Sequence, residues 1–127
     1  MTVGIVDTTV IAHIFRKNAE AKAWLVAQTN KLSVTSITWL EVMYGAPGKI
    51  GQQVCKTILD EFELINLTED DQTWAMTQMQ ACRLSRGIGI NDCLIASVCH
   101  RLQIPIYTHN VKDMTKILPV ARVIHPY

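Results

Sequence analysis

Four carboxylates in this 127-residue sequence stand at positions where a charge needs an explanation: Asp7, Glu41, Asp92 and Asp113. Asp7 directly follows a short apolar run, and Asp92 shares a helical spacing of three, four and seven residues with apolar side chains. That spacing places Asp92 on the core-facing stripe of a helix. Because burying an unpaired carboxylate is costly, we expect these acids to share a partner that balances their charge.

A hard divalent cation is the partner that such a group of acids favours. Two carboxylates about 6 Å apart repel each other by roughly 3 kcal/mol at an effective dielectric constant of 20, so a cluster must either raise its pKa values or bind a cation. Oxygen ligands without histidine select Mg²⁺, with Mn²⁺ as the alternative, over zinc. Such a cation suits phosphoryl chemistry, because it lowers the pKa of a bound water and stabilises the leaving oxygen.

The elements that must position these acids follow from the alternation of apolar runs and helical spacings. Strands are expected at residues 3–6, 32–35, 62–67, 104–107 and 122–124, with helical segments between them. This alternation predicts an α/β fold with a mostly parallel central sheet and helices on both faces.

Local signals predict where the helices begin and end. Asn91 is expected to cap the helix that carries Asp92 in its first turn. Thr68 and Asp71 resemble a capping box at the start of the longest helix, and Gly87 lies just past its end. The apolar positions expected to face the core include Ala23, Trp24 and Ala27 in the second helix and Val54, Ile58 and Leu59 in the fourth.

This topology brings the four acids to one edge of the sheet. Ligands of parallel α/β sheets bind beyond the carboxyl ends of the strands. Asp7 ends the first strand there, and Asp113 follows the strand at 104–107. The helix that begins near Asp92 runs back against the sheet to feed that strand, so its start lies at the same edge. Glu41 lies in the second turn of the helix that leaves the second strand.

The arrangement resembles the PIN domain, and most closely the short VapC-type ribonuclease toxins. Four pieces carry the resemblance, in the family's order and from end to end of the chain: residues 5–9 (IVDTT), 36–45 (SITWLEVMYG), 91–96 (NDCLIA) and 108–113 (THNVKD). The resemblance implies a three-layer α/β/α fold and a single nuclease domain over residues 1–127.

The resemblance also implies a function. It implies an Mg²⁺-dependent endoribonuclease, the toxin of a type II toxin–antitoxin system, that hydrolyses RNA phosphodiester bonds with a metal-activated water. A cognate antitoxin protein and a homodimer are the implied partners. By position, the implied metal-binding and catalytic residues are Asp7, Glu41, Asp92 and Asp113, and the implied supporting residues are Thr8, Thr108 and Asn110.

Contacts to the RNA are not carried over from the family. Arg83 and Arg86 close the long helix, where the helix dipole alone explains them; together with Lys112 they are also candidates for contacts to an RNA backbone. The chain departs from the family's usual residues at three positions near the motifs: Cys93, His109 and Met114.

Each acid also has an ordinary explanation. Asp7 and Asp92 suit the start of a helix, Glu41 suits a capping box with Thr38, and Asp113 lies near two lysines as in a surface ion pair. A non-catalytic PIN-fold interaction module and a housekeeping PIN nuclease without an antitoxin therefore remain alternatives.

Two other phosphoryl-transfer classes fit poorly. A response-regulator receiver needs an acidic pair near the first strand and an aspartate after the third, where this chain has Leu67 and Thr68. A haloacid-dehalogenase-like phosphatase needs Asp-x-Asp after the first strand, and this chain has Asp7-Thr8-Thr9.

Composition limits the remaining possibilities. The net charge of +1 excludes a non-specific coat on nucleic acid, which would be far more basic. No apolar run is long enough to span a bilayer, and the N-terminus lacks the basic region of a signal peptide, so we expect a cytoplasmic protein without membrane contact. The four cysteines form no CxxC pair and are expected to be small buried side chains in a reducing compartment.

Overall fold

The computed structural model describes residues 2–127. Its strands are β1 (Ile5–Val6), β2 (Ser33–Thr35), β3 (Glu63–Ile65), β4 (Ile106–Tyr107) and β5 (Val123–Ile124). Its helices are α1 (Thr8–Phe15), α2 (Ala19–Ala27), α3 (Ser36–Gly45), α4 (Gly48–Leu59), α5 (Glu69–Arg86), α6 (Ile90–Leu102), α7 (Val111–Met114) and the short 3₁₀ helix η1 (Val120–Arg122).

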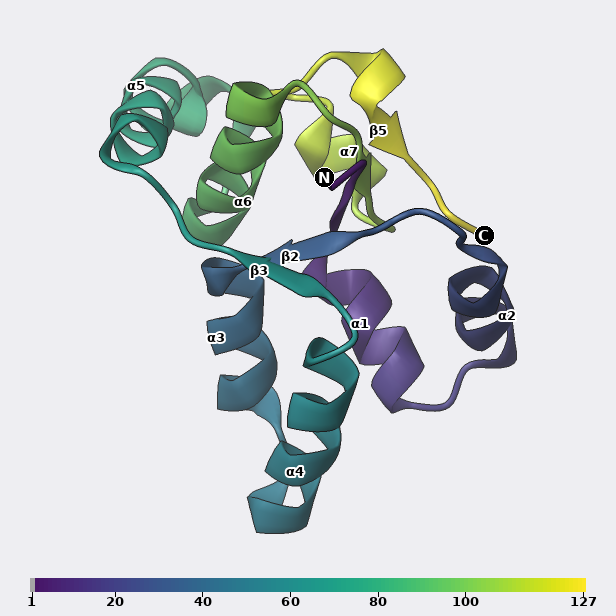
Figure 1. Cartoon of the computed structure of the whole chain (residues 1–127). Coiled ribbons are helices and arrows are strands. Elements are labelled where there is room, and N and C mark those ends of the chain that lie inside the picture. Colours follow the sequence, from purple (N-terminus) through teal and green to yellow (C-terminus); the bar gives the residue numbers. More distant parts are fainter. Residues whose placement is uncertain (1) are drawn as a thin grey trace.

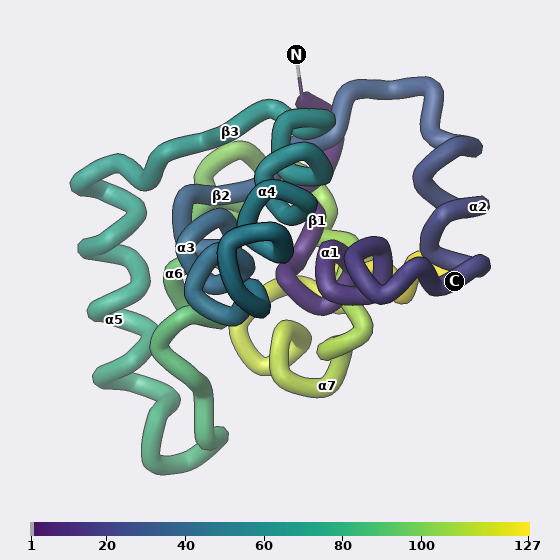
Figure 2. Tube along the Cα trace, turned by 90° about the horizontal axis from the view of Figure 1, so that it is seen from below, coloured from purple at the N-terminus to yellow at the C-terminus, as the bar shows by residue number. Residues whose placement is uncertain are grey.

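The strands form one parallel sheet in the order β3-β2-β1-β4-β5. Helices α1, α3 and α4 cover one face, and α5 and α6 cover the other (Figure 1). The view from below in Figure 2 shows α1, α3 and α4 side by side in front of the sheet, in agreement with their mutual contacts. The predicted three-layer α/β/α fold with a parallel central sheet is confirmed.

The central strand β1 anchors both layers through two consecutive residues. Successive side chains of a strand point to opposite faces. Ile5 packs with Ile95 and Ile106 on the side of α6, and Val6 packs with Val10 on the side of α1. Both β1 side chains are completely buried. The end of β1, where Asp7 follows, is therefore held from both sides.

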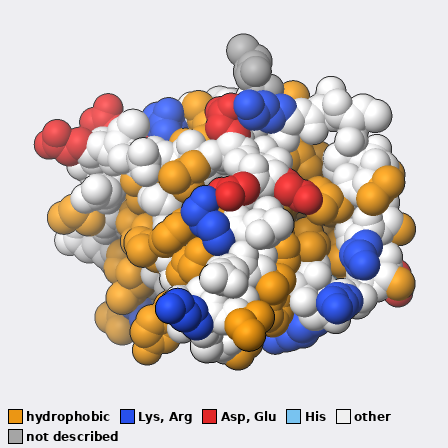
Figure 3. All heavy atoms as spheres, turned by 60° about the horizontal axis from the view of Figure 1, so that its bottom comes forward, with side chains coloured by type: hydrophobic (Ala, Val, Ile, Leu, Met, Phe, Trp, Pro, Cys, Tyr) orange, Lys and Arg blue, Asp and Glu red, His pale blue; other side chains and the backbone are white. Residues whose placement is uncertain are grey.

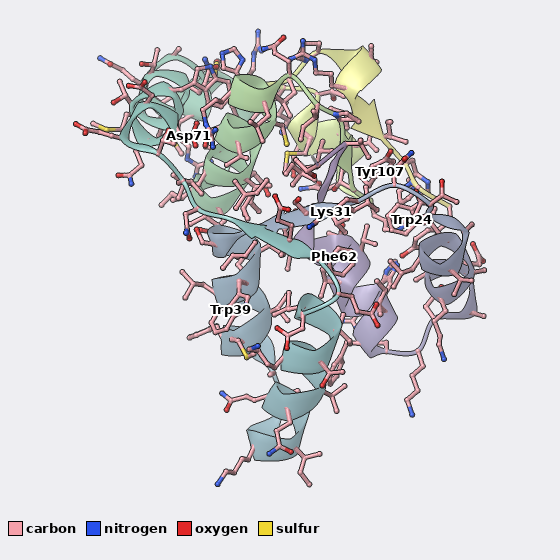
Figure 4. The ribbon with its side chains drawn as sticks, in the orientation of Figure 1. Trp24, Lys31, Trp39, Phe62, Asp71 and Tyr107 are labelled. Carbon is pink, nitrogen blue, oxygen red and sulfur yellow. The ribbon has the colours of Figure 1, made fainter. Side chains whose placement is uncertain are left out.

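An internal ion pair joins the start of α5 to the end of α6. The predicted capping box is present, with reciprocal hydrogen bonds between Thr68 and Asp71. The buried Asp71 carboxylate also accepts a hydrogen bond from Arg101 Nε at 2.9 Å (Figure 4). Gly87 ends α5 with a φ of 69°, a conformation that glycine adopts without strain, and α6 then packs along α5.

Some details of the sequence prediction were wrong. Asn91 does not cap α6, because the helix begins two residues earlier than expected and Gly89 occupies the N-cap. Of the residues expected to face the core, Ala23, Ala27 and Val54 are exposed. In an alanine-rich helix such as α2 every face carries small apolar residues, so alanine spacing does not identify the buried side; α2 buries Ala21 instead.

The remaining predictions about burial are confirmed in part. Cys55, Cys93 and Cys99 are buried, Cys82 is half-buried, and all four thiols are free.

Within residues 2–127, no helix combines the length and the apolar character needed to cross a membrane.

Candidate active site

Asp7 lies at the end of β1 with its side chain only 3% exposed. Its backbone N–H donates to Tyr107 O at 3.0 Å, which continues the pairing of β1 with β4. The residue occupies the N-cap position of α1, but its side chain makes no capping hydrogen bond. Instead, Asp7 Oδ2 accepts hydrogen bonds from Thr108 Oγ1 at 2.6 Å and from Thr9 Oγ1 at 3.3 Å. Helix capping therefore does not account for this carboxylate.

Burial sets the electrostatics of Asp7. Desolvation raises the pKa of Asp7 above its ordinary value, the hydroxyls of Thr108 and Thr9 oppose that rise, and the charge of Glu41 adds to it. The Thr108 hydroxyl, the Thr8 backbone N–H and the Thr9 hydroxyl, in that order, thus favour the ionised form of an acid that is almost completely shielded from water.

Glu41 connects three helices. It lies in the second turn of α3, which begins at Ser36 and is capped by Thr35, so the alternative of a capping box with Thr38 is wrong. Its Oε1 accepts a hydrogen bond from Thr8 Oγ1 of α1 at 2.7 Å. Its Oε2 accepts one from Asn91 Nδ2 of α6 at 3.1 Å. A capping box is therefore not the role of Glu41, and both of its oxygens are directed by neighbouring elements.

Asp92 lies in the first turn of α6, as predicted, and its Oδ2 accepts a hydrogen bond from Asn110 Nδ2 at 3.2 Å. Burial is the main reason that the pKa of Asp92 is raised to about 6, and the charges of Asp7, Asp113 and Glu41 add to the rise, in that order. The contacts also place Asp92 near two other acids, because Asn91 of the same turn donates to Glu41 and the 108–110 loop donates to both Asp7 and Asp92.

Asp113 differs from the other three acids. It belongs to α7 and its side chain is 38% exposed. Its Oδ1 forms an ion pair with Lys116 Nζ at 2.8 Å, and the hydrogen bond from Lys116 is the main reason that the pKa of Asp113 is lowered. The ordinary interpretation of a surface ion pair is thus correct for its present contact, although its charge still acts on Asp92.

The loop at 108–110 supplies donors to two of the acids. Thr108 Oγ1 donates to Asp7 and accepts a hydrogen bond from the Asn110 backbone N–H at 2.8 Å. The His109 backbone N–H donates to Thr9 Oγ1 at 3.1 Å. Since the Asn110 side chain contacts Asp92, the loop bridges the acid of β1 and the acid of α6.

The three basic candidates do not gather at the acids. Arg83 lines an open depression of about 590 Å³ together with Glu41, Asn91 and Asp92. Arg86 instead donates to the Lys116 carbonyl at 2.6 Å. Lys112 is exposed on α7. Only Arg83 therefore lines the depression beside the acidic group.

Three polar residues of this site were not predicted from the sequence. Thr9 and Asn91 donate to Asp7 and Glu41, and the buried Thr38 lies with its hydroxyl 3.1 Å from Thr8 Oγ1. Asn91 directly precedes Asp92, so its place in the same first turn was a usable signal. Thr9 is two residues from Asp7, but no local pattern indicates that its hydroxyl turns back to that carboxylate.

The chemistry of the donor set fits a hard divalent cation such as Mg²⁺, because four carboxylates converge without histidine among them. As the side chains of residues 2–127 stand, no three His, Cys, Asp or Glu side chains are close enough together to hold a metal ion. The reason is visible in the contacts: each carboxylate turns to its own donor, respectively Thr108, Thr8 with Asn91, Asn110 and Lys116.

A family model for the PIN domain matches residues 4–116 of the chain. The match spans β1 to α7 and thus includes all four acids. The chain matches no curated protein sequence.

Solved structures with the same fold match nearly the whole chain. A toxin–antitoxin complex from Klebsiella pneumoniae is 28% identical, with a TM-score of 0.78 and 98% of each chain covered. DNA-bound VapBC from Salmonella typhimurium is 21% identical, also with a TM-score of 0.78 and 98% of each chain covered. VapC20 from Mycobacterium tuberculosis, described as a toxin that cleaves the sarcin-ricin loop, is 13% identical with a TM-score of 0.70, covering 94% of this chain and 98% of that one.

Replacing Asp92 with asparagine is expected to stabilise the metal-free protein at neutral pH. The folded-state pKa of about 6 exceeds the unfolded value of about 3.9, so the ionised carboxylate opposes folding above pH 6 and this penalty disappears as the pH falls toward 4. After allowance for solvent screening of a half-buried group, Asp92→Asn should gain about 1 kcal/mol at pH 7.5, or roughly 3–5 °C in Tm.

The measurement is thermal unfolding in EDTA at pH 7.5 and pH 5. The gain should shrink at pH 5, where the wild-type carboxyl is largely protonated in the fold. Asp60→Asn is the matched control, since Asp60 is exposed and paired with Lys56, and it should give no gain. A wild type that is as stable as Asp92→Asn at pH 7.5 would contradict the expectation.

Proposed function

The chain belongs to the PIN domain family, and we propose that it is an Mg²⁺-dependent endoribonuclease that acts as the toxin of a toxin–antitoxin pair. The observation that carries the proposal is the hydrogen-bond network that connects Asp7, Glu41 and Asp92, from three segments, at the carboxyl edge of the sheet, with Asp113 following in α7. The Klebsiella structure is a toxin–antitoxin complex, and VapC20 cleaves RNA at the sarcin-ricin loop; both support the proposal by similarity.

In this proposal the cation is held by Asp7, Glu41, Asp92 and Asp113. When bound, it supplies a water ligand of lowered pKa and neutralises charge on the phosphate. The protein's own part is to aim the carboxylates: Thr108 directs Asp7, Thr8 directs Glu41, and Asn110 directs Asp92.

Arg83 is the basic residue placed to meet an RNA phosphate. It lines the depression that also contains Glu41 and Asp92. A guanidinium group can donate two parallel hydrogen bonds to the oxygens of one phosphate. Arg86 and Lys112 do not line that depression. Lys112 lies beside Asp113 in α7, so it would contact RNA from that side of the acids.

An apolar surface beside the acids supports a protein partner. Leu40, Tyr44 and Ile50 on α3 and α4 are 58%, 95% and 77% exposed. A hollow of about 750 Å³ joins Leu40 and Tyr44 to Glu41 and Asn91. The space-filling view of the underside shows hydrophobic side chains exposed between charged ones (Figure 3). Exposed apolar groups next to a reactive site suit an antitoxin that covers both.

Cytoplasmic location, expected from the sequence, and homodimerisation, expected from the family resemblance, complete the proposal. The second candidate, a non-catalytic interaction module with the same fold, has no observation of its own in its favour. The acids and their donors are all present, and the activity of the variants below separates the two functions.

Purified protein with Mg²⁺ should cut RNA and leave a 5′-phosphate and a 3′-hydroxyl. Asp7→Asn and Asp92→Asn should each lower kcat/KM about 100-fold or more, because losing a charged ligand removes several kcal/mol of transition-state stabilisation. Gel analysis and mass spectrometry of the products measure both effects. Asp60→Asn, which removes an exposed acid paired with Lys56, should retain activity, and equal cleavage by all three variants would show that the acids do not do the chemistry.

Mg²⁺ or Mn²⁺ should raise the Tm of the wild type. A ligand at 100 times its Kd stabilises the folded state by about 2.7 kcal/mol, which corresponds to roughly 10 °C for a chain of this size. Glu41→Gln and Asp92→Asn should lose most of this rise. KCl at the same ionic strength controls for screening of the acidic charges. A wild-type Tm that neither divalent ion changes would count against a metal site.

Induced expression of the wild type should arrest growth, and expression of Asp7→Asn should not. The Asp7→Asn protein should bind the product of a small reading frame next to its own. Tyr44→Ser should raise the Kd of that complex at least 10-fold, because a nearly fully exposed tyrosine would be buried there. Leu84→Ser, on the exposed face of α5, is the control. If cells that express the wild type continue to grow although the purified protein cleaves RNA, a housekeeping nuclease would be favoured.

A further inference from the structure

Three rings surround the side chain of His109, which the proposed function does not use. The ring centroid of His109 lies 4.5 Å from that of His13 in α1. It lies 4.6 Å from His125 and 4.6 Å from Tyr127, with both pairs close to edge-on. The ring cluster of His13, His109, His125 and Tyr127 thus joins α1, the 108–110 loop and the segment that follows β5.

Hydrogen bonds fix the pairs within this ring cluster. His109 Nδ1 lies 3.0 Å from His125 Nε2, so one nitrogen donates and the other accepts. His13 Nδ1 lies 2.9 Å from the Tyr127 hydroxyl. Each ring is therefore held in orientation as well as in place.

The packing continues to the strand that leads into the loop. Tyr127 also packs against Trp24 of α2, with centroids 6.2 Å apart, and Trp24 packs against Tyr107 of β4 at 5.3 Å. Figure 4 shows Trp24 and Tyr107 close together between α2 and the sheet. The backbone agrees with this arrangement, since Thr108 N–H donates to Ile124 O at 3.0 Å. The segment 124–127 therefore holds residues 107–109 through both backbone and side chains.

The held loop carries the donors of the acidic site. Thr108 donates to Asp7 at 2.6 Å, and Asn110 donates to Asp92 at 3.2 Å. Between them, the His109 backbone N–H donates to Thr9, which itself donates to Asp7. A shift of the His109 ring would therefore move three donors relative to two carboxylates.

We propose that His125 and Tyr127 are positioning residues of the acidic site, which act by fixing His109 and thereby the donors on either side of it. The inference rests on the proposed function only in that the aimed carboxylates then bind a divalent cation. The geometry favours positioning over simple stabilisation, because the 108–110 loop that His125 and Tyr127 contact carries the donors to both Asp7 and Asp92. Misplacement by about 1 Å is enough to impair an active site of this kind.

The test compares Tyr127→Ala, Tyr127→Phe and His125→Ala in the full chain. His100→Ala is the matched control: it removes an exposed histidine from another aromatic pair, the stack of His100 on Trp74 at 4.8 Å, at the far end of α6 from Asp92. Amide hydrogen exchange, the NMR signal of the Asn110 side-chain amide, and the Kd for Mn²⁺ are measured for each.

Tyr127→Ala and His125→Ala should speed amide exchange at Thr108 and Asn110 at least 10-fold, shift the Asn110 side-chain signal, and raise the Kd for Mn²⁺ about 10-fold. Exchange in α4 and α5 should change no more than in His100→Ala. Tyr127→Phe keeps the ring and loses the hydroxyl, so it should retain most of the protection of the loop.

Uniformly faster exchange over the whole chain would overturn the inference, because it would show a structural role only. Faster exchange confined to the loop with unchanged Mn²⁺ affinity and an unchanged Asn110 signal would also overturn it. If the wild type bound no Mn²⁺, the proposed function would fail, and the Asn110 side-chain signal would still decide whether the ring cluster positions the donors.

Discussion

The main constraint on this structure is that it holds several carboxylates close together although their negative charges repel one another. Asp7, Glu41 and Asp92 lie close enough for their charges to interact, and Asp7 is nearly inaccessible to water. Each of the three accepts hydrogen bonds from neutral groups. A hydroxyl of the 108–110 loop donates to Asp7, and a side-chain amide of the same loop donates to Asp92. Glu41 accepts hydrogen bonds from side chains of α1 and α6. Neutral donors stabilise an ionised acid without cancelling its charge, so the site keeps its attraction for a cation.

The rest of the fold must resist that repulsion, and it does so from two places. Ile5 and Val6 hold the end of β1 between two hydrophobic clusters, which leaves Asp7 little freedom to move away. The internal Asp71–Arg101 pair joins α5 to α6 near the end of α6 that is remote from Asp92. A rigid scaffold with a strained, charged site is the usual compromise between stability and function. Burial and the charges of the other acids raise the pKa of Asp92 to about 6, so its ionised form is held at a cost to folding.

The fold could be predicted because apolar runs and helical spacings are local signals in the sequence. The convergence of the acids could be predicted because the topology determines which residues lie at the carboxyl edge of the sheet. The catalytic roles of these acids stay predictions. What the sequence could not reveal depends on distant or single-residue events. Gly89, and not Asn91, is the N-cap of α6, because hydrophobic spacing does not fix the first residue of a helix. The rings around His109 join residues 13, 109, 125 and 127, and no spacing rule connects positions so far apart.

Among the four acids, Asp113 is the one whose partner would have to change for a cation to bind. The others are held by hydroxyls and amides, which tolerate a cation on the opposite side of the carboxylate. Asp113 is paired with Lys116, whose positive charge would repel the incoming ion. The pair is partly exposed, and exposed ion pairs of this kind contribute only about 0–1 kcal/mol, so opening it costs little compared with the repulsion that a divalent ion relieves. Lys116 thus compensates part of the acidic charge, and in the proposed function its side chain would have to turn away from Asp113 before that carboxylate could bind the ion.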